Sequence, residues 1–413
     1  MSGRRVVVTG LGVVSPVGST IDSFWDSLIN GRSGIARVQQ MNVDDYRSQI
    51  AGEVSGFDAN AFVSKRDQRR MDPFTVLGIG AAKMAVQDSG IDFTREDPDR
   101  TGVVIGSGIG GLHVLTDQVR VLVNRGPSKF SPFMIPQMIV DIVAGYVAIE
   151  YNLRGPNFCV TSACASATHS IGESLRIIQS GDADVMLCGG AESCICELGL
   201  GGFSAMRALS TRNDDPQAAS RPFDADRDGF VIAEGAGVLI LEEYERAKAR
   251  GATIYCELAG YGRTCDAHHI TAPLEDGGGG AKAMKLAVND AGLNADEIDY
   301  LNAHGTSTPL NDKGETLATK AALGEEQARK MAISSTKSMT GHTLGAAGAV
   351  ESIACALTLQ NAVVPPTINY TTPDPDCDLD YVPNEARAMN VRACLNNSLG
   401  FGGHNATLCF KKF

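Results

Sequence analysis

The chain has 413 residues, of which 43% are hydrophobic and 20% are charged, and its formal net charge is −12. This composition is typical of a globular protein and excludes a fibrous or largely disordered chain, and the length predicts two or three domains or one large double-layered unit. The negative charge argues against a nucleic-acid partner bound through its phosphates. No apolar run approaches the length of about eighteen residues that a spanning helix needs, so we expect no membrane segment.

Eleven cysteines are scattered along the chain without a Cys-x-x-Cys pair, and only Cys194 and Cys196 are close neighbours. This pattern favours reduced thiols in a cytosol-like compartment over a disulfide framework or a zinc cage. The start, MSGRRVVVTGLGVV, has two arginines before apolar residues, but glycines interrupt the run and no small-residue cleavage site follows. We therefore interpret it as a first strand, not a signal peptide, and we expect a cytoplasmic protein.

Strand-like runs at residues 4–10, 102–108 and 184–190 alternate with segments of helix length. The alternation predicts an α/β fold with covered sheets, because strands buried on both faces form continuous apolar runs.

An internal repeat is also visible, since AVQDSGI at 85–91 resembles AVNDAGL at 287–293. Each copy is followed by an apolar strand that ends in small residues, and then by a small-residue turn that enters a helix. The repeated order predicts two similar halves, residues 1–255 and 256–413, with equivalent turns facing one site.

Cys164 lies in VTSACAS, after an apolar segment and ahead of a predicted helix. The inward face of that helix would carry Thr168, Ile171, Leu175 and Ile178, at helical spacing. At a helix N-terminus, free N–H groups and the dipole favour the thiolate, lower its pKa and supply donors for an oxyanion. A lone cysteine is usually a small buried hydrophobe, and we keep that interpretation for the other ten. The surroundings of Cys164 instead indicate a nucleophile.

Two of the seven histidines stand in specific settings. His304 is in NAHGTST at the end of a predicted strand, and His342 is in KSMTGH just before a glycine- and alanine-rich helix. A single histidine is more often structural, but two at strand-to-turn junctions beside glycines indicate catalysis.

A basic cluster has two interpretations, an ordinary solvated helix face or a docking patch for an acidic partner. It consists of Lys65, Arg66, Arg69 and Arg70, followed later by Arg125, Lys129 and Arg207.

Six long motifs, in one order over essentially the whole chain, resemble those of the beta-ketoacyl-acyl-carrier-protein synthases, specifically the elongating type II enzymes. They are VVVTGLGVVSPVG, GPNFCVTSACASATHSIG, RALSTRNDDPQAASRPFDADRDGFV, NAHGTSTPLNDKGE, SSTKSMTGHTLGAAGAVES and NNSLGFGGHNATLCF. The resemblance implies a thiolase-like fold, in which two pseudo-duplicated halves form a layered α-β-α-β-α core. It also implies a homodimer.

The implied activity is that of an acyltransferase in fatty-acid elongation. Cys164 takes an acyl group from an acyl carrier protein, with the backbone N–H groups of Cys164 and Phe401 as the oxyanion hole. A malonyl group on the carrier protein then loses carbon dioxide, and His304 and His342 donate hydrogen bonds to the enolate oxygen. The carbanion attacks the acyl thioester and releases a 3-oxoacyl thioester two carbons longer. No cofactor is expected beyond the carrier's 4'-phosphopantetheine.

The resemblance assigns further residues one by one. Lys337 and Glu351 would be an ion pair that orients the histidines, and Phe401 would gate the acyl pocket. Thr306 and Thr308 would bind the phosphopantetheine arm, and Ile109 and Phe203 would line the acyl tunnel. Thr271 and Arg207 would lie near its mouth, and Thr271 and Gly402, the latter in the glycine-rich loop after Phe401, would also contact the substrate. The basic cluster, namely Lys65, Arg66, Arg69, Arg70, Lys129 and Arg207, would dock the acidic carrier.

No metal is expected among the catalytic residues, because two neutral imidazoles suffice as donors. Asn302, Glu351 and Asn397 are candidates for a structural cation site that some relatives have. Leu399 stands where many relatives have Phe, and Met134 follows Phe133 where some have a second Phe. Both departures leave the chain-length preference open.

Three alternatives remain at this point. A thiolase acting on coenzyme A would use a second cysteine as a base late in the chain. A Cys-His hydrolase would transfer the acyl group to water. A non-catalytic partner of a polyketide synthase would keep the fold but usually lacks the nucleophile, which is present here as Cys164. Malonyl-dependent elongation with release of carbon dioxide would separate the first two from a condensing enzyme.

Overall fold

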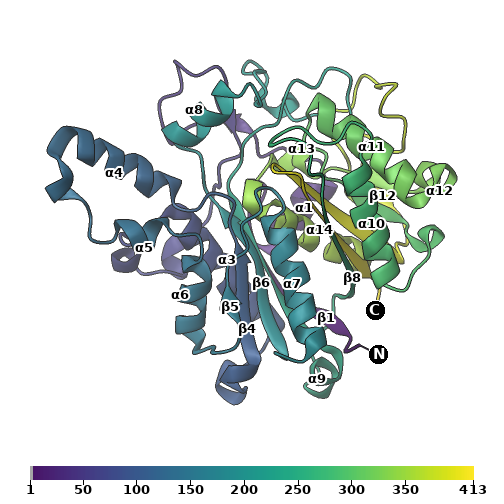
Figure 1. Ribbon diagram of the computed structural model, residues 1–413, viewed down its shortest axis with the longest axis horizontal. Coiled ribbons are helices and arrows are strands. Elements are labelled where there is room, and N and C mark those ends of the chain that lie inside the picture. The colour runs from purple at the N-terminus through teal and green to yellow at the C-terminus, as the bar shows by residue number, and fades with distance from the viewer. Residues whose placement is uncertain (1–2) are drawn as a thin grey trace.

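The computed structural model describes residues 3–413. Figure 1 shows two α/β halves side by side, the earlier part of the chain in purple to teal and the later part in green to yellow. A ten-stranded mixed sheet runs through both, in the order β10-β9-β13-β14-β8-β1-β7-β6-β4-β5. The strands are β1 (Val6–Val14), β4 (Thr101–Gly106), β5 (Asn157–Phe158), β6 (Val185–Glu192), β7 (Gly235–Glu243), β8 (Cys256–Cys265), β9 (Tyr300–Asn302), β10 (Ala332–Ser334), β13 (Ala393–Gly400) and β14 (His404–Lys411).

Two short hairpin sheets pair β2 (Ala36–Arg37) with β3 (Ile50–Ala51) and β11 (Val363–Val364) with β12 (Arg387–Ala388). The α-helices are α1 (Ile21–Ile29), α2 (Lys65–Gln68), α3 (Pro73–Ser89), α4 (Leu112–Arg125), α5 (Met134–Met138), α6 (Ile142–Tyr151), α7 (Ser166–Ser180), α8 (Glu197–Ala205), α9 (Tyr244–Ala249), α10 (Gly278–Asp290), α11 (Pro309–Leu323), α12 (Glu325–Lys330), α13 (Lys337–Thr340) and α14 (Ala347–Asn361). The three strands expected from the sequence, at 4–10, 102–108 and 184–190, overlap β1, β4 and β6, with bounds that differ by up to four residues.

The sheet consists of two five-stranded sets with the same topology. Counted outward from the middle, β1-β7-β6-β4-β5 and β8-β14-β13-β9-β10 each have antiparallel inner pairs and parallel outer pairs. The sets join through only two residue pairs of β1 and β8, Val7 with Glu257 and Val8 with Cys256. The first set precedes residue 256 and the second begins there, so we propose that boundary as the division between the two domains.

The repeated segments end equivalent helices, α3 and α10, which cover the outer faces of the two sets. Each helix packs so closely on its sheet that only glycine fits at the contact. A Cβ on Gly12 of β1 would lie 2.0 Å from the carbonyl oxygen of Ala81 in α3, and one on Gly262 of β8 would lie 1.9 Å from that of Ala283 in α10. The internal repeat is therefore a repeat of helix-on-sheet packing.

Helices α7 and α14 lie between the two sets and contact both. The residues expected on the inward face of α7, namely Thr168, Ile171, Leu175 and Ile178, are all fully buried there. The order α3, first set, α7 with α14, second set, α10 confirms the layered α-β-α-β-α fold. The equivalent strands β4 and β9 have their carboxyl ends on the same side of the molecule. Ligands of α/β proteins bind at the carboxyl ends of strands. No helix within residues 3–413 is both long and apolar enough to cross a bilayer.

Candidate active site

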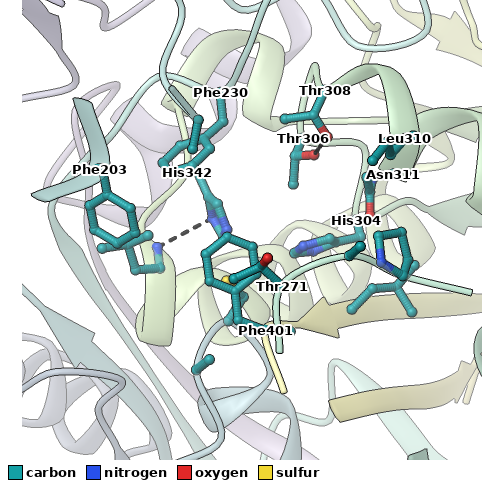
Figure 2. A pocket seen from close by; sticks show the side chains of 18 of the residues that line it. Phe203, Phe230, Thr271, His304, Thr306, Thr308, Leu310, Asn311, His342 and Phe401 are labelled. Atoms are coloured by element: carbon teal, nitrogen blue, oxygen red, sulfur yellow. Dashed lines mark hydrogen bonds between the residues drawn. The ribbon is translucent and has the colours of Figure 1, made fainter. Parts of the chain in front are cut away.

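A cavity of about 470 Å³ opens where loops of the two halves meet. The first half contributes Ile109, Cys164 and Phe203, and the second contributes His304, Thr306, Thr308, His342 and Phe401. Figure 2 shows the rings of His304 and His342 near each other, with Phe401 and Thr271 beside them and with Thr306 and Thr308 above His304 in this view. The site thus depends on both halves.

Cys164 lies in a tight turn immediately before α7 and is 9% exposed. Its neighbour Ala163 has φ of 50°, in the left-handed region that side-chain-bearing residues rarely adopt. The hydroxyl of Ser166 donates to the Ala163 carbonyl at 2.7 Å and accepts the Ser162 N–H at 2.9 Å. These bonds hold the strained turn, which presents the sulfur to the cavity.

The sequence predicted a thiolate at Cys164, stabilised by the helix N-terminus. For the enzyme without a bound substrate, this prediction is wrong. Burial raises the pKa of the Cys164 thiol to about 11, although the charge of Lys337 and the backbone N–H groups of Phe401 and Cys164 lower it. Desolvation prevails because the sulfur is enclosed and α7 begins two residues later, at Ser166. The same two N–H groups lie beside the sulfur, where the oxygen of a bound acyl group would develop charge.

His304 follows β9 and is held on both sides. Glu315 of α11 accepts the backbone N–H groups of His304 and Gly305, each at 2.8 Å. Behind the ring, Lys337 donates to the His304 carbonyl at 2.6 Å, and its Nζ lies 3.4 Å from Nδ1. Because an ammonium group has only donors, Nδ1 must offer a lone pair, which leaves the ring proton on Nε2.

His342 has the same tautomer for a different reason. Its Nδ1 accepts the backbone N–H of Leu344 at 3.3 Å, the dashed line in Figure 2, so Nε2 carries the proton. That Nε2 is buried without a hydrogen-bond partner within residues 3–413. The His304 and His342 ring centroids are 5.2 Å apart, with the planes at 83°.

Both imidazoles are neutral at neutral pH. Burial lowers the pKa of His304 and of His342 well below the usual value, and the nearby charge of Lys337 lowers both further. The two rings therefore offer N–H donors without positive charge, and the thiol that they flank is also uncharged.

Cys164 and the two histidines have ligand atoms within 4.8 Å of one another, a spacing that a metal ion could also use. A metal-bound imidazole normally donates its other N–H to an acceptor, which orients the ring. Here the other nitrogen, Nδ1, faces donors instead, Lys337 behind His304 and the Leu344 N–H behind His342. This arrangement favours two hydrogen-bond donors over a metal centre.

Lys337 and Glu351 form a buried ion pair between α13 and α14. Burial raises the pKa of Glu351 to about 7, and the charge of Lys337 opposes that rise. Neither residue lines the cavity; the pair lies behind His304, through Lys337.

The candidate cation site differs from the expectation in one member. Asn302 and Glu351 keep buried oxygens without a partner within residues 3–413, as does Asn396, which pairs with Asn302 in register. Asn397 instead points to the other face, where it bonds Glu315 and Thr407. Amide and carboxylate oxygens of this kind are the ligands that hard cations prefer.

The other expected substrate residues fall into two groups. Ile109, Phe203, Arg207, Thr271, Thr306 and Thr308 line the cavity, with the hydroxyls of Thr306 and Thr308 2.8 Å apart. Gly402 does not line it, although Gly400, Phe401 and Gly403 do. Its N–H donates to the carbonyl of Ile270 at 2.8 Å, so Gly402 joins two loops at the mouth.

The basic docking candidates are all exposed, and only Arg207 also lines the cavity. Lys65 and Arg66 lie on α2, with Arg69 and Arg70 just after it, and Lys129 lies in the turn after α4. The guanidinium of Arg70 sits 4.8 Å above the ring of Phe133, so its direction is fixed by that contact.

Three residues of the site were not singled out from the sequence. Phe230 packs edge-on against His342, with centroids 5.4 Å apart, and against Phe203 at 5.5 Å. Glu315 and Glu192 are buried carboxylates that hold site loops. Phe230 and Glu315 lie within motifs quoted above, but no feature of the sequence indicates that they belong to the site.

A layered α/β fold with two duplicated halves, and a thiol facing two imidazole donors at their junction, defines the thiolase-like condensing enzymes. Residues 3–247 match the family model described as "Beta-ketoacyl synthase, N-terminal domain", and residues 255–371 match "Beta-ketoacyl synthase, C-terminal domain". The chain therefore belongs to the beta-ketoacyl synthase family. It is an acyltransferase of the condensing type.

Similar proteins agree over the full length. The 3-oxoacyl-[acyl-carrier-protein] synthase 2 of Vibrio harveyi is 51% identical over 412 residues, covering 100% of this chain and 99% of the relative. That of Synechocystis is 50% identical over 410 residues, covering 99% and 98%.

Solved structures agree as well. A ketosynthase structure described as a type II polyketide synthase acyl-carrier protein in complex with its ketosynthase bound to the hexaketide is 38% identical, with a TM-score of 0.92 and full coverage of both chains. A beta-ketoacyl synthase from Burkholderia phymatum is 37% identical, with a TM-score of 0.91, covering 99% of this chain and 100% of that one.

Proposed function

We propose that this enzyme is a 3-oxoacyl-[acyl-carrier-protein] synthase that elongates fatty acids by two carbons. One observation carries the proposal: two neutral imidazoles, each with Nδ1 occupied, leave paired Nε2–H donors beside the Cys164 sulfur. Such donors match the enolate oxygen that forms when a malonyl thioester loses carbon dioxide.

In the first stage, the Cys164 sulfur attacks the thioester carbonyl of an acyl chain on a carrier protein. The N–H groups of Cys164 and Phe401 donate hydrogen bonds to the developing oxyanion. The acyl carbon exchanges one sulfur for another, and the thiol proton ends on the leaving pantetheine sulfur. No net base is consumed, which suits a site whose thiol starts uncharged.

In the second stage, the malonyl carboxylate leaves as carbon dioxide and its electron pair becomes the enolate. His304 and His342 hold the enolate oxygen, and the carbanion attacks the acyl carbonyl on Cys164. Collapse of the tetrahedral intermediate expels the Cys164 thiolate, which takes up one proton. Lys337, paired with Glu351, acts as a positioning residue for His304. Thr306 and Thr308 are suited to bind the pantetheine amides, and Phe401 to gate the acyl pocket.

The alternatives fit less well. A thiolase needs a second cysteine as a base, but among the residues described Cys164 is the only cysteine that lines the cavity. A hydrolase needs an imidazole acceptor for the proton of water, whereas both Nδ1 atoms already accept from fixed donors. A non-catalytic partner has no use for a nucleophile in a strained, preorganised turn.

The partner of this enzyme is an acyl carrier protein, and its assembly is a homodimer. Exposed lysines and arginines, of which Arg207 also lines the cavity, suit an acidic carrier, and one similar structure contains an acyl-carrier protein with its ketosynthase. All eleven cysteines are free, which supports a reducing compartment, the cytoplasm. The reaction needs no cofactor, because the substrates arrive on the carrier's phosphopantetheine.

Replacing the nucleophile tests this function. We expect Cys164→Ala to abolish condensation but to retain release of carbon dioxide from malonyl-carrier protein, because both imidazole donors remain. His304→Ala, the matched control, should lose both reactions. Carbon dioxide release and the masses of products from acyl carriers of several lengths measure the outcome. Elongation by the Cys164→Ala variant would refute the assignment.

A further inference from the structure

Glu192, the last residue of β6, is a fully buried carboxylate that no step of the proposed reaction uses. Its oxygens accept five hydrogen bonds from nitrogen and oxygen donors in two separate segments, and a longer one from the Cys194 thiol at 3.7 Å. The donors are the hydroxyl of Ser107 at 2.8 Å and the backbone N–H groups of Gly108 at 2.7 Å, Ile109 and Gly110 at 3.2 Å and Gly345 at 3.0 Å.

These contacts suit an ionised carboxylate, because a protonated one would set an O–H against an N–H. Burial raises the pKa of Glu192, and the Ser107 hydroxyl and the N–H groups lower it. Only glycine fits at the two backbone positions that lie against the Glu192 carboxylate, Gly108 and Gly345. A Cβ on Gly108 would lie 2.8 Å from a Glu192 oxygen, and one on Gly345 would lie 2.5 Å from it.

The first segment that Glu192 holds, residues 107–110, forms one wall of the acyl cavity, since Ile109 lines it. The second begins at Gly345, which follows Leu344. Leu344 has φ of 49°, a strained conformation for a residue with a side chain, and its N–H fixes the tautomer of His342. The Gly345 bond to Glu192 holds the chain immediately after this strained residue.

We propose that Glu192 is a positioning residue that ties the acyl-cavity wall at Ile109 to the orientation of His342. The inference rests on the proposed function. One carboxylate in the first half thus sets both the shape that the acyl chain meets and the donor that the enolate meets, although His342 belongs to the second half.

The test is Glu192→Gln, which keeps the size of the side chain but turns one oxygen into an N–H₂ group facing N–H donors. We expect malonyl decarboxylation to fall about tenfold or more relative to acylation of Cys164, the effect of losing a hydrogen bond to a charged group. Acylation depends on the Cys164 and Phe401 N–H groups and should fall less. The range of acyl lengths accepted should widen, because Ile109 is released.

Glu242→Gln is the matched control. Glu242 is equally buried but lies at the opposite end of the β6–β7 pair, opposite Val185, where it binds Arg250. We expect this variant to be less stable to heat, with the ratio of the two half-reactions unchanged.

A second measurement does not depend on activity. In protein labelled with ¹⁵N-histidine, the His342 ring of the wild type should show a protonated Nε2, and Glu192→Gln should show a mixture of tautomers. A folded variant with the wild-type tautomer and an unchanged ratio of half-reactions would overturn the proposal. If Glu192→Gln does not fold, Glu192→Asp is tested instead, because its carboxylate is one methylene further from the donors. The tautomer of His342 and the ratio of the half-reactions are then measured in the same way. A wild type that releases no carbon dioxide would instead reject the proposed function.

Discussion

Burial acts in opposite directions on the nucleophile and on the two hydrogen-bond donors, because it penalises the charged form of each. It raises the pKa of Cys164 to about 11 and lowers the pKa of His304 and His342 well below the usual value. All three groups are therefore neutral in the free enzyme. Neutral imidazoles suit the stabilisation of an enolate, whereas the neutral thiol needs help from the N–H groups beside it when it attacks.

The thiol can be titrated by its reaction with iodoacetamide, which requires the thiolate. With a pKa of about 11, the alkylation rate of Cys164 should rise about tenfold for each pH unit from pH 7 to 9.5. Cys164→Ser supplies the background, which includes the exposed thiol of Cys265. A rate that is already level at pH 7 would contradict this value and restore the thiolate expected from the helix position.

The sequence predicted which residues gather at the site better than it predicted their chemical state. Cys164, His304 and His342 could be found because each stands in a long motif beside small residues. Their tautomers could not, since they depend on Lys337, thirty-three positions from His304, and on a backbone N–H. The thiol pKa was predicted in the wrong direction because the sequence reveals the helix start but not the desolvation. Glu192 was missed because the sequence does not show which carboxylate is buried.

Among the elements, those of the core could be predicted and those of the mouth could not. The inward face of α7 could be predicted because the helix packs between the two sheet sets, which requires apolar residues at helical spacing. The similarity between the sequences of residues 85–91 and 287–293 could be recognised because α3 and α10 make the same close contact with glycines of their strands. The loop contact of Gly402 with Ile270 obeys no such period and appears only in three dimensions.

The element with the clearest expected partner is α2, whose basic side chains are exposed. Neutralising Lys65 and Arg69 should raise the apparent KM for acyl-carrier protein by about threefold to tenfold, because charge steering speeds encounter. Turnover of small thioester mimics should stay the same, and added salt should erase the difference.

The matched control removes two charges elsewhere. Lys282 and Lys285 are exposed on α10, the outer helix of the second half. Neutralising them should leave the KM for carrier protein unchanged. Equal effects of the two double variants, or equal effects on carrier-bound and small substrates, would exclude a docking role for α2.

For the molecule as a whole, the two ends of the sheet differ. At one end, β5 has two exposed residues, and Phe158 is 40% exposed; on the neighbouring helix α6, Ile149 is 79% exposed. An open strand edge beside exposed apolar side chains is a surface that pairs with another chain. This end of the sheet is therefore the contact we expect if the chain forms the proposed homodimer.

Placing a charge at that edge tests the contact. We expect the wild type to sediment as a dimer and Phe158→Asp to sediment as a monomer, because the carboxylate would be desolvated in the interface. Leu286→Asp is the control, since Leu286 is similarly exposed, at 40%, on the distant helix α10. Sedimentation of the two variants at equal concentration gives the masses. A dimer that survives Phe158→Asp would place the interface elsewhere.

The opposite end of the sheet limits how far such pairing can go. Strand β10 is equivalent to β5, yet its residues are buried, and the N–H of Ile333 on its outer edge donates to the carbonyl of Asp380 in a covering segment. A chain with two open edges could add copies without end, as a growing fibril does. With the β10 edge covered, pairing through the β5 edge can join two copies but cannot continue from sheet to sheet, so the sheet edges alone give no route to a filament.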